Sequence, residues 1–267
     1  MNMQRLSHVF LLVFLLAAVS GACWAEAPEV ADAAVACDLP PELTTPDVAF
    51  PRVAAALSAR HGVEILALGS GSTVGDTSGK GGPAFVYSRP AASFPYHMLE
   101  ALEASRPDAR FHLTVTGGRN MTAEAMLEVL QQEVAAHHYD LLVWQTGTVE
   151  AVRGLRPETM RDVLEDGIEA AAKAGADVTV VDPQFSRFLR ANTDLSPYQT
   201  TLQQTAMMNG AALFHRFDLT QGWSSSGAID LERASRSERD HTITLLNICL
   251  GRALAKFVLT GAAGAAH

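Results

Sequence analysis

The sequence predicts a three-layer α/β/α sandwich built on one parallel, doubly wound sheet. Three observations favour this fold class. The chain has 267 residues, of which 48% are hydrophobic, enough for one sizeable core without metals. Apolar, β-rich runs alternate with helical patterns, an order typical of parallel strands joined by crossover helices. There are five such runs, at 63–68, 111–116, 139–144, 178–182 and 211–215.

The first 25 residues have the pattern of a secretory signal peptide. Arg5 precedes an unbroken apolar run over 9–19, and small residues lead to Cys23, Trp24 and Ala25. The run is short for a membrane span, so we expect cleavage after Ala25. Lipid attachment at Cys23 is the alternative, because Gly and Ala precede it. The sequence thus predicts an exported, periplasmic or secreted protein.

A loose, Ala/Pro-rich arm is expected over 26–46, a domain over 47–260 and a flexible tail over 261–267. Within the domain, apolar residues at helical spacing predict helices over 123–136, 157–174 and 242–259. Ser196 and Pro197 have the order of a helix cap followed by a first-turn proline.

Two linkers, at 69–93 and 218–240, are longer than such a fold needs, and the sequence shows no internal repeat. Long loops in compact domains are commonly functional. Both are expected to leave the carboxyl ends of strands, where open α/β sheets bind ligands.

Charge and cysteine content exclude several functions. The net charge is −9, and removing Arg5 with the signal peptide makes it −10. Without a Lys/Arg cluster, neither nucleic acid nor an anionic membrane surface is an expected partner. No Cys/His group has zinc-ligand spacing, and the adjacent His137 and His138 would point in different directions on a helix, so no metal or cofactor is expected.

Two cysteines remain after cleavage, Cys37 and Cys249. We expect Cys37 to lie unpaired in the arm and Cys249 to pack in the last helix. A disulfide between them is the alternative, since export permits one.

Four short motifs follow the strand ends or open the last helix. They are Leu68-Gly69-Ser70-Gly71-Ser72-Thr73-Val74-Gly75, Thr116-Gly117-Gly118-Arg119-Asn120, Trp144-Gln145-Thr146-Gly147-Thr148-Val149-Glu150 and Glu238-Arg239-Asp240-His241. In order and spacing this set resembles the SGNH/GDSL hydrolases over roughly residues 62–260. The resemblance implies a flavodoxin-like sheet of strand order 2-1-3-4-5, with the four motifs converging on one cleft.

The resemblance also implies acyl transfer from an ester. A serine after the first strand attacks the carbonyl, a histidine on the last helix takes its proton, and an acid three residues earlier orients the histidine. Backbone N–H groups and an asparagine hold the oxyanion. By position, His241 and Glu238 correspond to the histidine and the acid.

The sequence departs from the family pattern at the reacting positions. Gly71 stands where the nucleophile is expected, and Val149 stands at the oxyanion asparagine. Glu150 replaces the acid after that asparagine. In the glycine block, Gly118 is kept, and the second glycine falls on Arg119 or Asn120, depending on a one-residue gap.

Each position has a simpler structural interpretation. Residues 69–72 are either only a tight turn or a turn that carries a displaced nucleophile, Ser70 or Ser72. His241 is either a base or a helix residue with local hydrogen bonds, and Asn120 either an oxyanion donor or a turn residue. Trp144 is expected in the core. The segment Asp182-Pro183-Gln184, which resembles a stretch in some bacterial members, is expected as a turn.

The combined loss at Gly71 and Val149 favours a pseudohydrolase, a protein that binds an O-acyl carbohydrate or lipid with weak or no turnover. The alternative is an active ester hydrolase that uses Ser70 or Ser72 with His241 and Glu238. A third hypothesis is a non-catalytic scaffold in an envelope assembly, with a protein partner.

Overall fold

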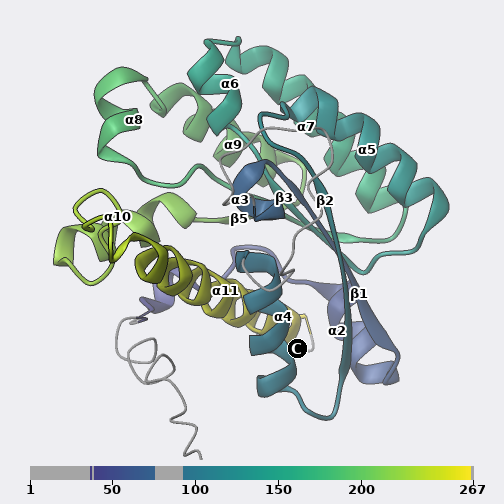
Figure 1. The fold of residues 1–267 in the computed structure, drawn as a ribbon. Helices are drawn as coiled ribbons and strands as arrows, with labels where there is room; N and C mark the ends of the chain where they lie inside the picture. The colour runs from purple at the N-terminus through teal and green to yellow at the C-terminus, as the bar shows by residue number, and fades with distance from the viewer. Residues whose placement is uncertain (1–36, 38, 76–92, 266–267) are drawn as a thin grey trace, which may run out of the picture.

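The fold is a five-stranded parallel sheet between two helical layers (Figure 1). The computed structural model describes residues 37, 39–75 and 93–265. The strand order is β2-β1-β3-β4-β5, as the resemblance implies. The predictions for the signal peptide, for most of the arm and for 76–92 lie outside the described residues. The strands are β1 Gly62–Gly69, β2 Arg110–Gly117, β3 Leu141–Gln145, β4 Asp177–Val181 and β5 Ala212–Phe214.

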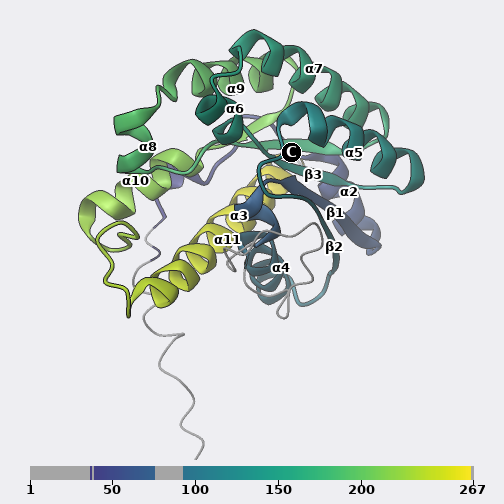
Figure 2. The same ribbon diagram turned by 45° about the horizontal axis from the view of Figure 1, so that its top comes forward.

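Helices cover both faces of the sheet, as Figure 2 shows from a second direction. One face packs against α2 Pro51–Ala59, α4 Phe94–Ser105, α10 Arg216–Ser226 and α11 Arg239–Gly264. The other packs against α5 Ala123–Ala136, α7 Pro157–Lys173 and α9 Ser196–Met208. Short helical segments connect these elements: η1 Pro41–Leu43, α3 Gly71–Val74, α6 Thr148–Arg153 and α8 Arg187–Asn192.

The layer formed by α5, α7 and α9 packs around Trp144 of β3. This indole is fully buried, and its Nε1 donates to Met126 Sδ of α5 at 3.3 Å. Gly167 of α7 lies so close to the ring that a Cβ there would overlap it. Trp144 is therefore a core residue, as expected, and helices α5 and α7 follow the predicted ranges to within one residue.

Helix α11 is longer at both ends than the predicted range 242–259. Gly261 lets the helix approach the Phe50 ring, and Gly251 does the same against the backbone of His97 in α4. Because Gly261 and Ala262 are buried, the flexible tail expected over 261–267 is wrong as far as residue 265. The helix is long and apolar enough to cross a membrane, but half of its most apolar window is buried inside the fold.

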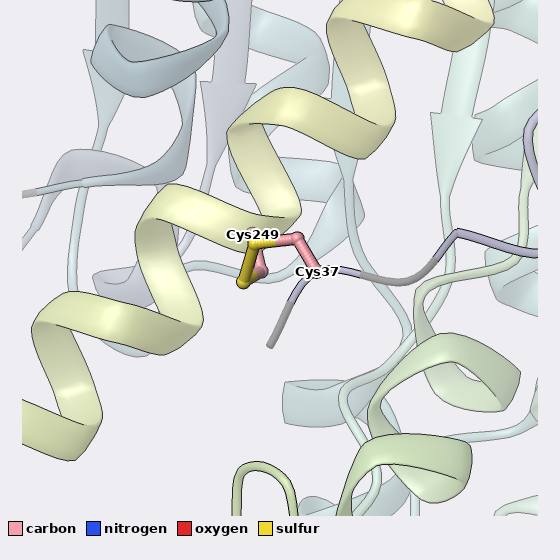
Figure 3. Close-up of a disulfide and its surroundings, with 2 residues drawn as sticks. All are labelled: Cys37 and Cys249. Atoms are coloured by element: carbon pink, nitrogen blue, oxygen red, sulfur yellow. A yellow bond between two sulfur atoms is a disulfide. The ribbon is translucent and has the colours of Figure 1, made fainter. Parts of the chain in front are cut away.

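A disulfide joins Cys37 to Cys249 (Figure 3). Cys249 is buried in the middle of α11, as expected, but the prediction of unpaired cysteines is wrong. The loose arm is also wrong for its described part. Leu39 and Leu43 pack against the core, and Thr44 is fully buried. Apolar contacts and the disulfide fix this segment on the sheet face that α11 covers.

The second long linker is partly helical. Helix α10 runs from Arg216 to Ser226, so it begins just before the predicted loop 218–240 and occupies the first part of it. Leu219 and Trp223, four residues apart, are buried against the core on one side of this helix. Their burial overrides the polar composition that indicated a loop.

Candidate functional site

The ends of β1 and β2 meet through glycines. Gly117 has φ +121°, and a Cβ there would overlap the carbonyl oxygen of Gly69, its partner in the ladder. Gly118 N–H donates to the same oxygen at 3.1 Å. The glycine block thus permits a close backbone contact beside the turn that carries Ser70, Gly71 and Ser72.

The side chain of Gln145 organises that turn. It ends β3, is 1% exposed, and its Oε1 accepts from four donors. Ser70 donates through its N–H at 3.2 Å and its hydroxyl at 3.0 Å. The hydroxyl of Ser72 lies at 3.3 Å and that of Thr73 at 3.1 Å from the same oxygen. Both candidate nucleophiles therefore direct a proton to an amide oxygen.

The turn at Gly71 leaves room for a side chain. Gly71 opens α3 and is not among the residues with positive φ. The nearest atom to a Cβ built there is Cγ of Arg119, at 3.9 Å, an ordinary van der Waals distance. A serine would fit at this position, so backbone geometry does not explain the glycine. Its consequence is chemical, because the position has no hydroxyl.

A buried arginine lies on the other side of Ser72. Arg216, in the first turn of α10, is 3% exposed, and its Nη1 donates to Ser72 Oγ at 3.1 Å. Its guanidinium carbon lies 5.8 Å from the centre of the Phe94 ring, a distance typical of a cation–π contact. Burial lowers the pKa of Arg216 to about 10, and the attraction of Asp182 opposes that shift.

Asp182, just after β4, is 4% exposed and accepts from Phe217 N–H at 2.8 Å. Burial raises its pKa to about 8, while this hydrogen bond and the charge of Arg216 act in the opposite direction. Asp182-Pro183-Gln184 is a connection after a strand, as expected, but its carboxyl also holds the start of α10.

Glu150 supports the backbone and does not face a ligand. It is 2% exposed, and its two carboxylate oxygens accept from Gly147 N–H at 2.9 Å, Thr146 Oγ1 at 3.4 Å and Ala123 N–H. The carboxylate thus caps its own helix α6 and also the first turn of α5. These bonds give Glu150 a structural role, and its predicted binding role stays a prediction.

Val149 lies in α6, and Asn120 lies in the connection after β2, near this edge of the sheet. Val149 is half-buried in α6 and has no polar side-chain atom. Asn120 has φ +62° and is exposed, and its carbonyl accepts from Arg153 Nη2 at 3.0 Å. The left-handed backbone supports the turn interpretation of Asn120, since asparagine tolerates that conformation well.

No hydrogen bond joins the described side chains of Glu238 and His241. Glu238 Oε2 accepts from Ser235 Oγ at 2.6 Å and Ser235 N–H at 3.2 Å, and these bonds lower the pKa of Glu238. His241 is exposed, and among the described residues no hydrogen bond joins it to Glu238, Ser70 or Ser72. In both views the first turn of α11 lies beside the end of α10 and apart from α3 (Figures 1 and 2).

The expected convergence of four motifs therefore holds for three. The motifs after β1, β2 and β3 share hydrogen bonds and backbone contacts, whereas the fourth lies in solvent at the start of α11. Sequence reasoning also missed Gln145 and Arg216 as site residues. Gln145 could have been found as a polar residue at the end of an otherwise apolar strand. For Arg216, the sequence shows only that it follows the fifth strand. In residues 37, 39–75 and 93–265, no three His, Cys, Asp or Glu side chains could hold a metal ion.

Comparison with known proteins identifies the family that this chain matches. A family model described as "non-GDSL lipase-like family" matches residues 36–264. No curated protein matches the chain.

Several solved structures share the fold. A mutant of Axe2, an acetyl-xylooligosaccharide esterase from Geobacillus, is 15% identical with a TM-score of 0.56, covering 74% of this chain and 94% of its own. A putative GDSL-like lipase from Parabacteroides merdae is 10% identical with a TM-score of 0.55, covering 71% and 96%. The hydrolase LAE5 from the Lake Arreo metagenome is 15% identical with a TM-score of 0.54, covering 73% and 98%.

Proposed function

Because the chain belongs to the non-GDSL lipase-like family, a branch of the SGNH/GDSL-type fold, we propose that it is a pseudohydrolase. It binds an O-acyl carbohydrate or lipid at the carboxyl edge of the sheet and hydrolyses it weakly or not at all. One observation carries this proposal. Gly71 occupies the nucleophile position, and the two neighbouring serine hydroxyls donate to the amide oxygen of Gln145.

Attack on an ester needs a base that removes the hydroxyl proton as the new bond forms. An amide oxygen accepts a hydrogen bond but does not take up a proton near neutral pH, so Gln145 cannot activate Ser70 or Ser72. Ser72 also accepts from Arg216, which leaves its oxygen less electron-rich. The exposed His241 lies apart from this turn, and Glu238 is bonded to Ser235.

Stabilisation of the tetrahedral intermediate is weakened as well. Val149 supplies no side-chain donor where the family places an asparagine, and removing one such donor typically costs about a hundredfold to a thousandfold in rate. The nucleophile, the base and this donor serve one transition state. Their joint absence supports binding without turnover more strongly than any single change.

Export is part of the proposal. A disulfide between Cys37 and Cys249 is expected to persist in an oxidising compartment and to be rare in the cytosol. The signal-peptide pattern of residues 1–25 supports the same location. We therefore place the protein in the periplasm or outside the cell.

The first test is covalent labelling with a fluorophosphonate probe, together with turnover of p-nitrophenyl acetate. We expect no stoichiometric labelling and little turnover. Labelling of Ser70 or Ser72 that disappears in His241→Ala would overturn the proposal and establish the active hydrolase.

The double variant Gly71→Ser/Val149→Asn sharpens this test. A serine fits at residue 71, but its hydroxyl would still lack a base, so we expect the variant to stay inert. Binding is measured by calorimetry with acetylated xylo-oligosaccharides, a probe chosen because Axe2 is an esterase of such compounds. Wild type that binds no acetylated saccharide or acyl lipid would favour the scaffold hypothesis.

A further inference from the structure

The protein groups around Arg216 provide hydrogen-bond partners for only part of its guanidinium. It is buried, it donates to the neutral hydroxyl of Ser72, and its Nε has no hydrogen-bond partner among the residues that the structure describes. A guanidinium has five N–H donors, and a buried donor without a partner costs about 1–3 kcal/mol. Buried charges are normally paired or hydrogen-bonded, so this arginine needs an explanation.

Asp182 does not neutralise Arg216 fully. The two attract each other electrostatically, but no direct ion pair or hydrogen bond joins their side chains. Burial raises the pKa of Asp182 to about 8, so near neutral pH its carboxyl is largely protonated. One carboxyl oxygen of Asp182 also accepts a hydrogen bond from Phe217 N–H. The guanidinium therefore keeps positive charge beside Ser72.

We propose that Arg216 and Ser72 form an anion-binding subsite that takes a carboxylate or phosphate group of the ligand. An anion that replaces Gln145 as the acceptor of the Ser72 hydroxyl proton would lie next to Arg216 Nη1, which reaches that hydroxyl at 3.1 Å. A charge-assisted bond between guanidinium and oxyanion is roughly twice as strong as a neutral one. The subsite therefore selects an anionic group over a neutral ester carbonyl.

Access and local charge support this subsite. Arg216 is buried, but Ser72 is exposed on the turn that opens α3. The Arg119 side chain also lies beside this turn, with its Cγ 3.9 Å from the Cβ position of residue 71. Among the described residues, the Ser72 hydroxyl has two hydrogen-bond partners, Gln145 and Arg216, and neither is a carboxylate. A ligand that reaches Ser72 thus lies beside the Arg216 guanidinium, on a protein whose overall charge is −9.

This inference deepens the proposed function, because it assigns a charged group to the ligand at the same edge. The proposed function and the anion-binding subsite can fail separately. Labelling by a fluorophosphonate tests whether a serine is activated, whereas binding of simple anions tests Arg216 and needs no ester. An active hydrolase could still hold an anionic group here, and a pseudohydrolase could lack the subsite.

The test is calorimetric titration of the full-length mature protein with inorganic phosphate, sodium acetate and neutral methyl acetate, at constant ionic strength set with chloride. We expect saturable binding of at least one anion and none of methyl acetate. Binding of phosphate alone would identify a phosphate-bearing ligand, and binding of acetate alone a carboxylate.

Variants locate the binding. Arg216→Gln is expected to weaken anion binding about tenfold or more, because a charge-assisted bond is lost. Ser72→Ala is a small change at an exposed position that removes one acceptor of Arg216 and keeps the buried arginine, so it should fold even where Arg216→Gln does not, and it is expected to weaken binding severalfold. Arg233→Gln is the matched control, since its side chain is 78% exposed and pairs with Asp230 away from this turn.

Two results would overturn the inference. One is the absence of saturable binding of either anion by the wild type. The other is binding that Arg216→Gln and Ser72→Ala leave unchanged, which would place the anion elsewhere on the protein.

Discussion

Two regions correspond to the two halves of a hydrolase active site, and they differ in how they are held. The half formed by the ends of β1, β2 and β3 is tied together by ladder contacts and by the Gln145 side chain. The half at the start of α11 is exposed, and the Glu238 carboxylate accepts hydrogen bonds from Ser235, three residues earlier. The first half holds the Ser70–Ser72 turn against Gln145, whereas the second places Glu238 and His241 in solvent without a hydrogen bond between them among the described residues.

The difference shows what fixes a site in space. Parallel strands place their carboxyl ends at one edge, whatever side chains follow. The start of a helix is placed only by what packs against it, and the first turn of α11 is exposed. Substitutions that disturb backbone contacts should therefore have large effects in the first half and small effects in the second.

The largest effect is expected for Gly117→Ala. A Cβ there would overlap the Gly69 carbonyl, and the φ of +121° is itself unfavourable for alanine. We expect a loss of about 3 kcal/mol or more in the free energy of unfolding, measured by urea denaturation. Gly210→Ala is the control: its φ is +70°, but no atom lies within 4 Å of the added Cβ, so about 1–2 kcal/mol is expected. Equal losses would show that the strand-end contact is not tight.

A smaller loss is expected for Gln145→Leu, which removes the acceptor of four hydrogen bonds while keeping the side-chain volume similar. Buried Thr73 and half-buried Ser70 would be left without this partner, so about 2–3 kcal/mol of stability should be lost. Gln203→Leu, on the exposed side of α9, should change stability by about 0.5 kcal/mol at most. If both variants unfold at the same urea concentration, Gln145 does not hold the turn.

A pH-dependent effect is expected for Asp182→Asn. The pKa of Asp182 rises from 3.8 to about 8 on folding, so between these values the folded state binds more protons than the unfolded state. The contribution of this carboxyl to stability therefore falls as the pH rises through that window. Relative to wild type, the variant should gain about 2–3 kcal/mol of stability between about pH 5 and about pH 7. Melting temperatures at the two pH values test this, with exposed Asp166→Asn as the control; an opposite slope would contradict it.

The smallest effects are expected for Glu238→Ala and His241→Ala. Both residues are exposed, and each change should alter stability by about 0.5 kcal/mol or less. Neither should alter fluorophosphonate labelling or residual ester turnover. A large loss of turnover in either variant would mean that the start of α11 reaches the Ser70–Ser72 turn during catalysis, and the contrast between the two halves would fail.

The sequence predicted the sheet well because its strands are continuous apolar runs with clear ends. Helices α5 and α7 were predicted within one residue for a similar reason, since each presents one apolar face. Helix α10 was missed because its few apolar residues face two different cores, Leu219 and Trp223 one and Phe217 the other, among polar and small residues. The disulfide was not expected, because spacing alone does not show that Cys37 returns to the middle of α11.

The candidate site was harder to predict. The spacing of Glu238 and His241 is the same whether the helix starts in a cleft or in solvent, so the motif could not show that the pair is unassembled. The roles of Gln145 and Arg216 depend on partners 73 and 144 residues away, respectively, at Ser72. Such contacts become visible only when the strand order is known. The capping role of Glu150 likewise depends on Ala123, 27 residues earlier.

The bond between Cys37 and Cys249 has a consequence for how the molecule responds to proteases. It links residues 212 positions apart, and all five strands lie between them. The chain is therefore a covalent ring with two short ends. A single cut at any peptide bond inside the ring leaves both fragments attached, so a nicked molecule should run as one band on a denaturing gel until a reductant is added. Two cuts, or one cut after reduction, are needed to release a fragment.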